Sequence, residues 1–169
     1  MILYKMTLKT PLGTMIALSD DNALYLLEFI ERKKLEWEIA RLQKNIGATL
    51  LERRSAPLDQ IEQELSLYFK AKLPQFHTPL ALVGTPFQKS VWQELQKIPL
   101  GTTKSYQDLA LALNKPTAAR AVAQANASNQ LALIIPCHRV INSTGAMGGY
   151  AAGVDRKQWL LTHEKTFLD

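Results

Sequence analysis

Cys137 is the only cysteine of the chain, and His138 and Arg139 follow it directly. A cysteine attacks electrophiles as its thiolate, and neighbouring cationic side chains lower the thiol pKa from about 8.5. This order of residue types therefore indicates a nucleophilic cysteine in an electropositive setting. The alternative is a buried structural cysteine that happens to precede a histidine, because cysteines outside disulfides are often buried and inert.

Some element must position this cysteine, and the residues before it predict one. Residues 131–135, Leu-Ala-Leu-Ile-Ile, form an apolar run with the length of a short buried strand. Pro136 ends the run, because proline cannot donate a hydrogen bond to a sheet ladder. We therefore expect Cys137 at the point where a rigid strand ends and the chain turns.

Composition limits the other kinds of site. The 169 residues are 47% hydrophobic and 21% charged, as in an ordinary globular protein. A single cysteine excludes an internal disulfide, and His77, His138 and His163 lack the spacing of zinc ligands, so we expect neither a metal nor a cofactor. No window approaches the ~20 apolar residues of a membrane span, and no signal-peptide pattern opens the sequence, so we expect a cytoplasmic protein.

The net charge of +5 is unevenly distributed along the chain. Residues 1–83 carry 11 Lys and Arg against 10 Asp and Glu, whereas residues 84–169 carry 9 against 5. The half that contains Cys137 therefore has the charge to bind an anionic partner such as nucleic acid. A solvated surface with a mild basic bias is the alternative explanation.

The first half of the chain, residues 1–83, predicts an α/β scaffold without recognisable chemistry. Turn signals at residues 10–13 and 20–22 separate three strands, and such short connections imply antiparallel hairpins. The expected elements are strands 2–9, 13–19, 23–30 and 48–52, helices 31–43 and 57–70, and a strand or extended connector over 78–83.

The second half, residues 84–169, predicts short helices. Thr85 and Gln88 form a capping box at one helix start, and Ser105 begins another helix with Asp108 three residues on. Two short helices joined by a few residues suggest a helix-turn-helix. The expected helices run from 86 to about 98, from 105 to about 113, from 117 to 126 and from 154 to 164.

The helix expected over 117–126 is mostly alanine, with one long cation, Arg120. A helix that reads bases in a major groove usually carries several polar side chains. We therefore expect this smooth helix to lie in a narrower groove, where Arg120 can fill the space that an extruded base leaves. An alanine-rich core helix is the alternative.

A glycine-rich segment lies between the cysteine and the last helix. Residues 145–153 include four glycines, and Tyr150 lies among small residues. Glycine allows sharp bends and close approach of the backbone to another group. We interpret this segment as the wall of a pocket, with a plain surface loop as the alternative.

Taken in order, these segments resemble the O6-alkylguanine-DNA alkyltransferases, which are methylated-DNA–protein-cysteine methyltransferases. The likeness covers about residues 85–164 and depends on the motifs GTPFQ at 84–88, SYQ at 105–107, ARAV at 119–122, IPCHRV at 135–140 and WLL at 159–161. It implies an α/β protein with two domains. Residues 1–83 would form a ribonuclease H-like domain, and residues 84–169 a mostly helical, winged-helix-like DNA-binding domain that carries the active-site cysteine.

The resemblance also implies roles for matching residues. Cys137 would accept the alkyl group, His138 would deprotonate it through a water molecule, and Glu164 would orient His138. Asn129 would be the hinge between the recognition helix and the active-site turn. The other implied positions are Tyr106, which rotates the nucleotide and bonds the purine edge; Arg120, Thr117 and Ala119 at the DNA; Val140, Gly148, Tyr150 and Ala151 in the substrate pocket; and Lys157, which assists the leaving oxygen.

The implied function is direct repair of O6-alkylguanine, and of O4-alkylthymine, in double-stranded DNA approached through the minor groove. A monomer would transfer the alkyl group irreversibly to its own cysteine, without a cofactor, a metal or a membrane. Ser128, Gln130, Ala132 and Ala151 depart from residues common in the family, which bears on hinge stiffness and pocket width. The residues alone also leave open a cysteine peptidase or acyl hydrolase, and a helix-turn-helix regulator without chemistry.

Overall fold

Short turns after the first and second strands force the start of the chain into antiparallel hairpins. In the computed structural model, which describes residues 1–168, β1 (Ile2–Thr10) pairs with β2 (Gly13–Ser19), and β2 pairs with β3 (Leu24–Phe29). The three predicted strands and their antiparallel pairing are confirmed.

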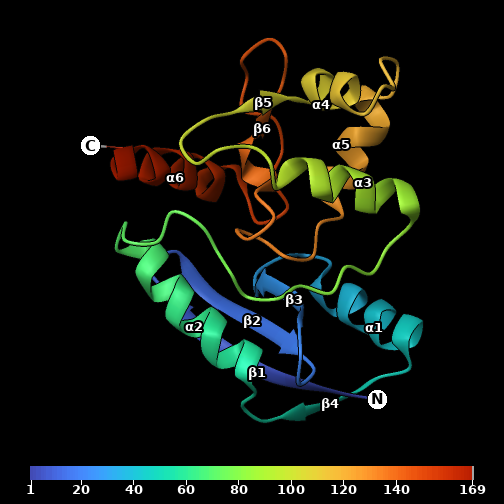
Figure 1. Cartoon of the computed structure of the whole chain (residues 1–169), viewed down its shortest axis with the longest axis vertical. Helices are drawn as coiled ribbons and strands as arrows, with labels where there is room; N and C mark the ends of the chain where they lie inside the picture. Colours follow the sequence, from blue (N-terminus) through green and yellow to red (C-terminus); the bar gives the residue numbers. More distant parts are fainter. Residues whose placement is uncertain (169) are drawn as a thin grey trace. The chain divides into compact units, whose positions relative to one another are not determined.

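The fourth strand joins the other edge of this sheet. β4 (Thr49–Glu52) runs parallel to β1, which gives the order β3-β2-β1-β4. A parallel neighbour requires a crossover connection, and α1 (Leu35–Ile46) supplies it. The apolar side of α1 packs with β2 and β3 in one buried cluster, and α2 (Ala56–Phe69) lies against β1 and β2 (Figure 1).

The charged run that was expected to open α1 is not helical. α1 begins at Leu35 rather than at residue 31, because Arg32 turns inward and its carbonyl accepts the Leu35 N–H (3.1 Å). Arg32 is buried and pairs with the buried carboxylates of Glu28 and Glu38. Burial raises the pKa of Glu38 to about 7, although the Arg32 charge opposes this shift. The cluster joins β3 to α1, so this stretch is not simply a solvated helix face.

Three short helices follow in the second half of the chain. Both capping boxes, Thr85 with Gln88 and Ser105 with Asp108, are confirmed. The last of the three helices begins at residue 119 rather than 117, because the Ala118 N–H closes a turn onto the Lys115 carbonyl (2.9 Å). The helices are α3 (Pro86–Leu95), α4 (Tyr106–Ala112) and α5 (Ala119–Ala127), and α5 packs against both others.

The strand expected over residues 131–135 is absent, and this prediction is wrong. The segment folds into tight turns, in which the Ile135 N–H donates to the Leu131 carbonyl (3.0 Å) and Leu133 adopts a left-handed φ of 71°. Asn129 bonds the Leu131 N–H and the Ile135 carbonyl, and thus satisfies groups that a sheet would have paired. The apolar side chains are buried as expected, but in a turn.

Two very short strands were not predicted. β5 (Lys104–Ser105) pairs in parallel with β6 (Val140–Ile141), directly before α4 and directly after the 3₁₀ turn η1 (Cys137–Arg139). The chain then runs through the glycine-rich segment into α6 (Val154–Lys165) and the short turn η2 (Thr166–Leu168).

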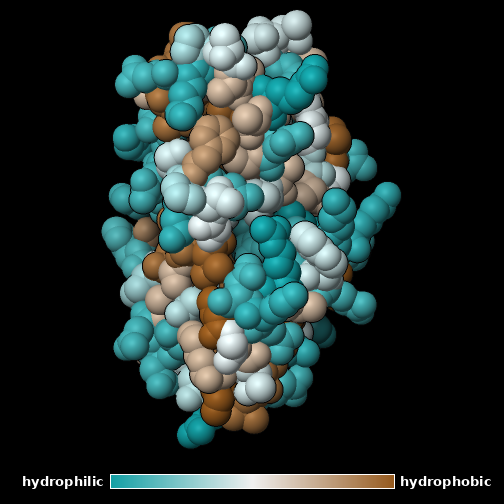
Figure 2. Space-filling view, turned by 90° about the vertical axis from the view of Figure 1, so that its right-hand side faces the viewer, coloured by the Kyte–Doolittle hydropathy of each residue, from teal (hydrophilic) through white to brown (hydrophobic). Residues whose placement is uncertain are grey.

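The chain separates into two compact units, Met1–Val83 and Gly84–Asp169, which we call unit 1 and unit 2. Figure 2 shows one face of the molecule, on which hydrophilic side chains are widespread and apolar side chains lie between them. Within residues 1–168, none of the helices has the length and apolar character that a membrane crossing requires.

Gly84 provides a test of packing in unit 2. A β-carbon at this position would lie 2.6 Å from Cη2 and 2.8 Å from Cζ3 of Trp92, a buried ring whose indole N–H donates to the Ala125 carbonyl (2.9 Å). Because the ring is held, we expect Gly84→Ala to lower the free energy of unfolding by about 1–3 kcal/mol. Urea denaturation monitored by tryptophan fluorescence measures this value.

The matched control for this prediction is Gly149→Ala. A β-carbon at Gly149 meets no atom within 4 Å, so the free energy of unfolding should change by less than about 0.5 kcal/mol. Equal denaturation midpoints for the two variants would contradict the predicted clash.

Candidate active site

Cys137 is the first residue of η1 and is 7% exposed. Its N–H donates to the Ile135 carbonyl (2.7 Å), and its own carbonyl accepts from Nδ2 of the buried Asn126 in α5 (3.4 Å). The backbone of the cysteine is thus held from both sides. Asn126 was not identified from the sequence, where it appears only as one polar residue in an alanine-rich helix.

Asn129 organises the turn that precedes the cysteine. The side chain is buried, its Nδ2 donates to the Ile135 carbonyl (2.9 Å), and its Oδ1 accepts the Leu131 N–H (2.9 Å). Asn129 lies just beyond the end of α5, so its carboxamide connects that helix to the turn that leads to Cys137.

The structure brings His138 and Glu164 together, although 26 positions separate them in the sequence. Nε2 of His138 lies 2.8 Å from Oε2 of Glu164, and both side chains are buried. Nδ1 of His138 is also buried and has no hydrogen-bond partner among the described residues. One ring nitrogen is therefore fixed by the carboxylate, which leaves the other for a second contact.

Arg139 belongs to the same network, which was not foreseen. Its Nε and Nη2 lie 2.7 and 3.0 Å from the two Glu164 oxygens, and its Nη1 donates to the Ile98 carbonyl (2.8 Å). Burial raises the pKa of Glu164, but His138 and Arg139 together outweigh burial and lower the pKa to about 2. The sequence showed Arg139 only as a positive charge beside the sulfur, because its carboxylate partner is remote.

Lys157 is buried and bridges two segments of backbone. Its Nζ donates to the Val140 carbonyl in β6 (2.6 Å) and to the Gly149 carbonyl in the glycine-rich segment (3.1 Å). Burial lowers the pKa of Lys157, and the charge that Cys137 carries when ionised opposes that shift, so the ammonium lies near enough to interact with Cys137. Two of the three Lys157 donors therefore point at carbonyls.

Tyr106, the first residue of α4, faces the same region. Burial raises the pKa of its hydroxyl, and the charge of Cys137 raises that pKa further. Gly148 has a φ of +72°, and a β-carbon there would lie 3.3 Å from the Tyr106 hydroxyl and 3.6 Å from Lys157 Nζ. The positive φ and the close approach to the Tyr106 hydroxyl therefore favour glycine at position 148.

The remaining pocket residues lie in the next turn of the chain. The Gly153 N–H donates to the Tyr150 carbonyl (2.9 Å), which closes a turn around Ala151. Tyr150 is half-buried and Ala151 is exposed. Both lie on the segment that Lys157 holds through Gly149.

The residues expected to contact DNA lie at the opposite end of α5 from Cys137. Thr117 is exposed in the turn before α5, Ala119 is half-buried, and Arg120 is exposed in the first turn of the helix. Because a helix rises 1.5 Å per residue, Arg120 lies about 9 Å along α5 from Asn126, which contacts Cys137.

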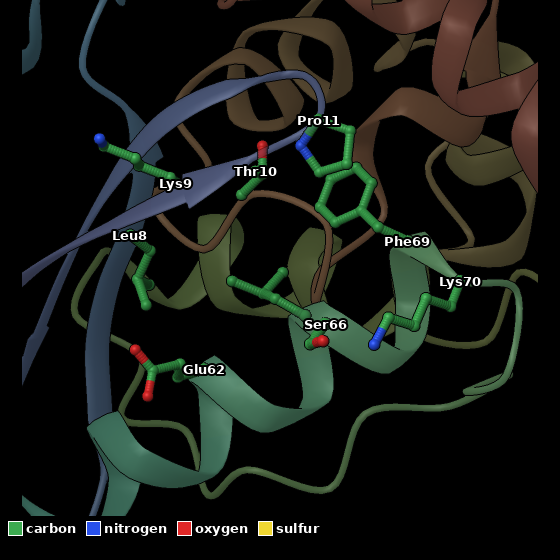
Figure 3. Close-up of a pocket in the computed structure, with 9 residues that line it drawn as sticks. Leu8, Lys9, Thr10, Pro11, Glu62, Ser66, Phe69 and Lys70 are labelled. Atoms are coloured by element: carbon green, nitrogen blue, oxygen red, sulfur yellow. The ribbon is translucent and has the colours of Figure 1, made fainter.

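Two cavities elsewhere contain none of this chemistry. One, of about 260 Å³, lies in unit 1 between the end of β1 and α2, where Pro11 and Phe69 contribute apolar walls (Figure 3). The other, of about 430 Å³, lies in unit 2 beside α4, with Lys97 and Asp108 in its lining. Cys137 lines neither, and residues 1–168 contain no group of three or more His, Cys, Asp and Glu side chains arranged to hold a metal ion.

Known proteins match the chain over nearly its whole length. Residues 86–166 match the family model for the 6-O-methylguanine DNA methyltransferase, DNA binding domain. A methylated-DNA–protein-cysteine methyltransferase of Methanosarcina barkeri is 39% identical and aligns with 98% of this chain and 99% of its own. The constitutive enzyme of the same name from Bacillus subtilis is 37% identical over 96% of this chain and 95% of its own.

Solved structures agree with the sequence matches. The O6-methylguanine methyltransferase of Mycobacterium tuberculosis superposes with a TM-score of 0.83 at 35% identity, over 97% of this chain and 93% of that one. The crystal structure of Mycobacterium tuberculosis OGT in complex with DNA gives a TM-score of 0.82 at 32% identity, over 99% and 94%. The fold, the site and these relatives agree, and the chain belongs to the methylated-DNA–protein-cysteine methyltransferase family.

Proposed function

We propose that this protein repairs O6-alkylguanine in double-stranded DNA by transferring the alkyl group to Sγ of Cys137. The thiolate attacks the alkyl carbon, the bond from that carbon to O6 breaks, and its electron pair stays on the guanine, which takes up one proton. The observation that carries the proposal is the single cysteine, buried beside a His138–Glu164–Arg139 network in a member of this family. The thioether is stable, so each molecule acts once and needs no cofactor or metal.

His138 is the base in this proposal. Glu164 fixes Nε2, which leaves Nδ1 to accept the thiol proton through a water molecule. Arg139 shares the carboxylate, and together with His138 keeps it charged down to about pH 2. The relay is thus oriented by a group that stays ionised at every working pH.

Extrusion of the base is a physical requirement of the reaction. The alkylated oxygen lies on the pairing edge of guanine, where a thiolate cannot reach it inside a duplex. Unit 2 is proposed to be a winged-helix-like domain that places α5 in the minor groove, with Arg120 filling the space of the extruded base and Thr117 and Ala119 beside it. The exposed first turn of α5 supports this assignment.

The pocket is proposed to receive the flipped base between β6 and the glycine-rich segment. Tyr106 bonds the purine edge, the Val140 carbonyl and the Ala151 N–H complete the edge contacts, and Tyr150 packs beside the base. Lys157 positions both walls through the Val140 and Gly149 carbonyls and contributes positive charge near the sulfur and the leaving oxygen. O4-alkylthymine is proposed as a second substrate of this pocket.

Unit 1 is proposed to be a ribonuclease H-like scaffold. The whole protein is proposed to act as a monomer in the cytoplasm. The sheet order β3-β2-β1-β4, with a helical crossover to a parallel β4, supports the scaffold assignment.

The function is tested by intact-mass measurement after incubation with duplex DNA that contains one O6-methylguanine. We expect the protein to gain one methyl group, located on the peptide that contains Cys137, and Cys137→Ser to gain none, because the serine hydroxyl is a far weaker nucleophile. Removal of more than one methyl group per protein would indicate a turning-over enzyme. Sequence-specific DNA binding without transfer would favour a regulator.

The relay is tested by titration of the thiol. We expect His138→Ala and Glu164→Gln to raise the pKa of Cys137 and slow its reaction with iodoacetamide at pH 7, because each removes part of one proton path. The double variant should be slower by less than the product of the single effects. His163→Ala, which removes a histidine of α6 that is outside this network, is the matched control. Multiplicative effects in the cycle would show that no relay exists.

The Arg120 role is tested by comparing two substrates. Arg120→Ala removes the side chain that occupies the vacated stack, so methyl transfer from duplex DNA should slow roughly tenfold to hundredfold, in line with about 1–3 kcal/mol per stacking contact. Reaction with free O6-methylguanine base, which needs no extrusion, should be unchanged. Lys165→Ala controls for the loss of one exposed charge. An equal loss on both substrates would rule out the stacking role.

A further inference from the structure

Asn142 leaves the β5–β6 pair beside Tyr106. The two strands run in parallel, with Lys104 opposite Val140 and Ser105 opposite Ile141. Tyr106 follows β5 and Asn142 follows β6, so both lie at the same end of this small sheet. A pair of two-residue strands thus brings together two polar side chains that are 36 positions apart in the sequence.

Gly148 gives the distances at this corner of the pocket. A β-carbon on Gly148 would lie 3.3 Å from the Tyr106 hydroxyl, 3.4 Å from Oδ1 of Asn142 and 3.6 Å from Nζ of Lys157. Three polar groups therefore surround one point, and Lys157 also bonds the Val140 carbonyl (2.6 Å). Asn142 is part of the same wall as the groups to which the proposed reaction assigns base contacts.

The backbone of Asn142 is fixed, while its side chain is available. The Asn142 N–H donates to the Ala146 carbonyl (3.0 Å), and the Asn142 carbonyl accepts the Gly145 N–H (2.9 Å). The residue is exposed, and within residues 1–168 its carboxamide makes no hydrogen bond. The backbone of Asn142 is therefore fixed, and its carboxamide is available for a hydrogen bond to a ligand.

We infer that Asn142 reads the N2–N3 edge of the flipped guanine and so selects guanine lesions over thymine lesions. On that edge guanine presents the N2 amino donor next to the N3 acceptor, whereas thymine presents only the O2 acceptor. A carboxamide carries an acceptor and a donor side by side, which matches the guanine pattern. The inference rests on the proposed function, and it adds a contact that depends on the 2-amino group.

The test compares three lesions in one duplex sequence: O6-methylguanine, O6-methylhypoxanthine, which is the same base without the 2-amino group, and O4-methylthymine. We expect Asn142→Ala to slow transfer from O6-methylguanine about tenfold, since a bidentate pair between a side chain and a base edge has at least roughly that value. Transfer from the other two lesions should slow less, because each keeps an acceptor for the carboxamide N–H but lacks the amino donor for its oxygen. Ser143→Ala, at the neighbouring exposed loop position, is the matched control and should change none of the three rates.

The outcomes separate this inference from the reaction itself. If wild-type protein takes up no methyl group from any lesion, the proposed function fails and the inference fails with it. If wild-type protein is active but Asn142→Ala has the wild-type preference among the three lesions, or slows all three equally, only the reading by Asn142 is overturned.

Discussion

The shared carboxylate of Glu164 is the interaction on which the site depends. A buried ion pair stabilises a protein only when the hydrogen-bond geometry of the pair is good and its remaining donors and acceptors are satisfied. Here His138 and Arg139 occupy both oxygens, and Arg139 also reaches the Ile98 carbonyl. One carboxylate on α6 thereby fixes the cysteine turn and connects it to the chain just after α3. Loss of any one of the three side chains would leave another buried without its partner. A partly formed network would therefore lower the free energy of unfolding.

Side chains bonded to backbone, rather than sheets or helices, hold the reactive residue. Cys137 lies in a single 3₁₀ turn, and the β5–β6 sheet that follows this turn has two residues in each strand. Asn126, Asn129 and Lys157 supply hydrogen bonds that regular structure would otherwise provide, to the buried carbonyls of Cys137, Ile135 and Val140. Such groups require partners in any fold. Here the partners also determine where the sulfur, the imidazole and the pocket wall lie.

How far the sequence predicted the structure depends on how local each signal was. The hairpins and the capping boxes at Thr85 and Ser105 were predicted correctly, because the residues that decide them are at most a few positions apart. The run 131–135 was misjudged, since an apolar stretch signals burial without specifying strand or turn. Asn129, the residue that decided between them, was assigned a hinge role only by family likeness. The link from Arg139 to Glu164 and the β5–β6 pair depend on long-range contacts that no local pattern encodes.

Lys157 holds the glycine-rich segment through its backbone rather than through its side chains. Both of its acceptors, at Val140 and Gly149, are main-chain carbonyls, and every amino acid supplies one. Substitutions along this segment therefore leave the two Lys157 hydrogen bonds intact wherever the backbone conformation is retained. Gly148 is the exception, because its positive φ disfavours other residues. Lys157 therefore holds the backbone of the loop independently of most side chains along it. Single substitutions in the loop can therefore change the substrate preference without a compensating change at Cys137 or in the His138–Glu164–Arg139 network.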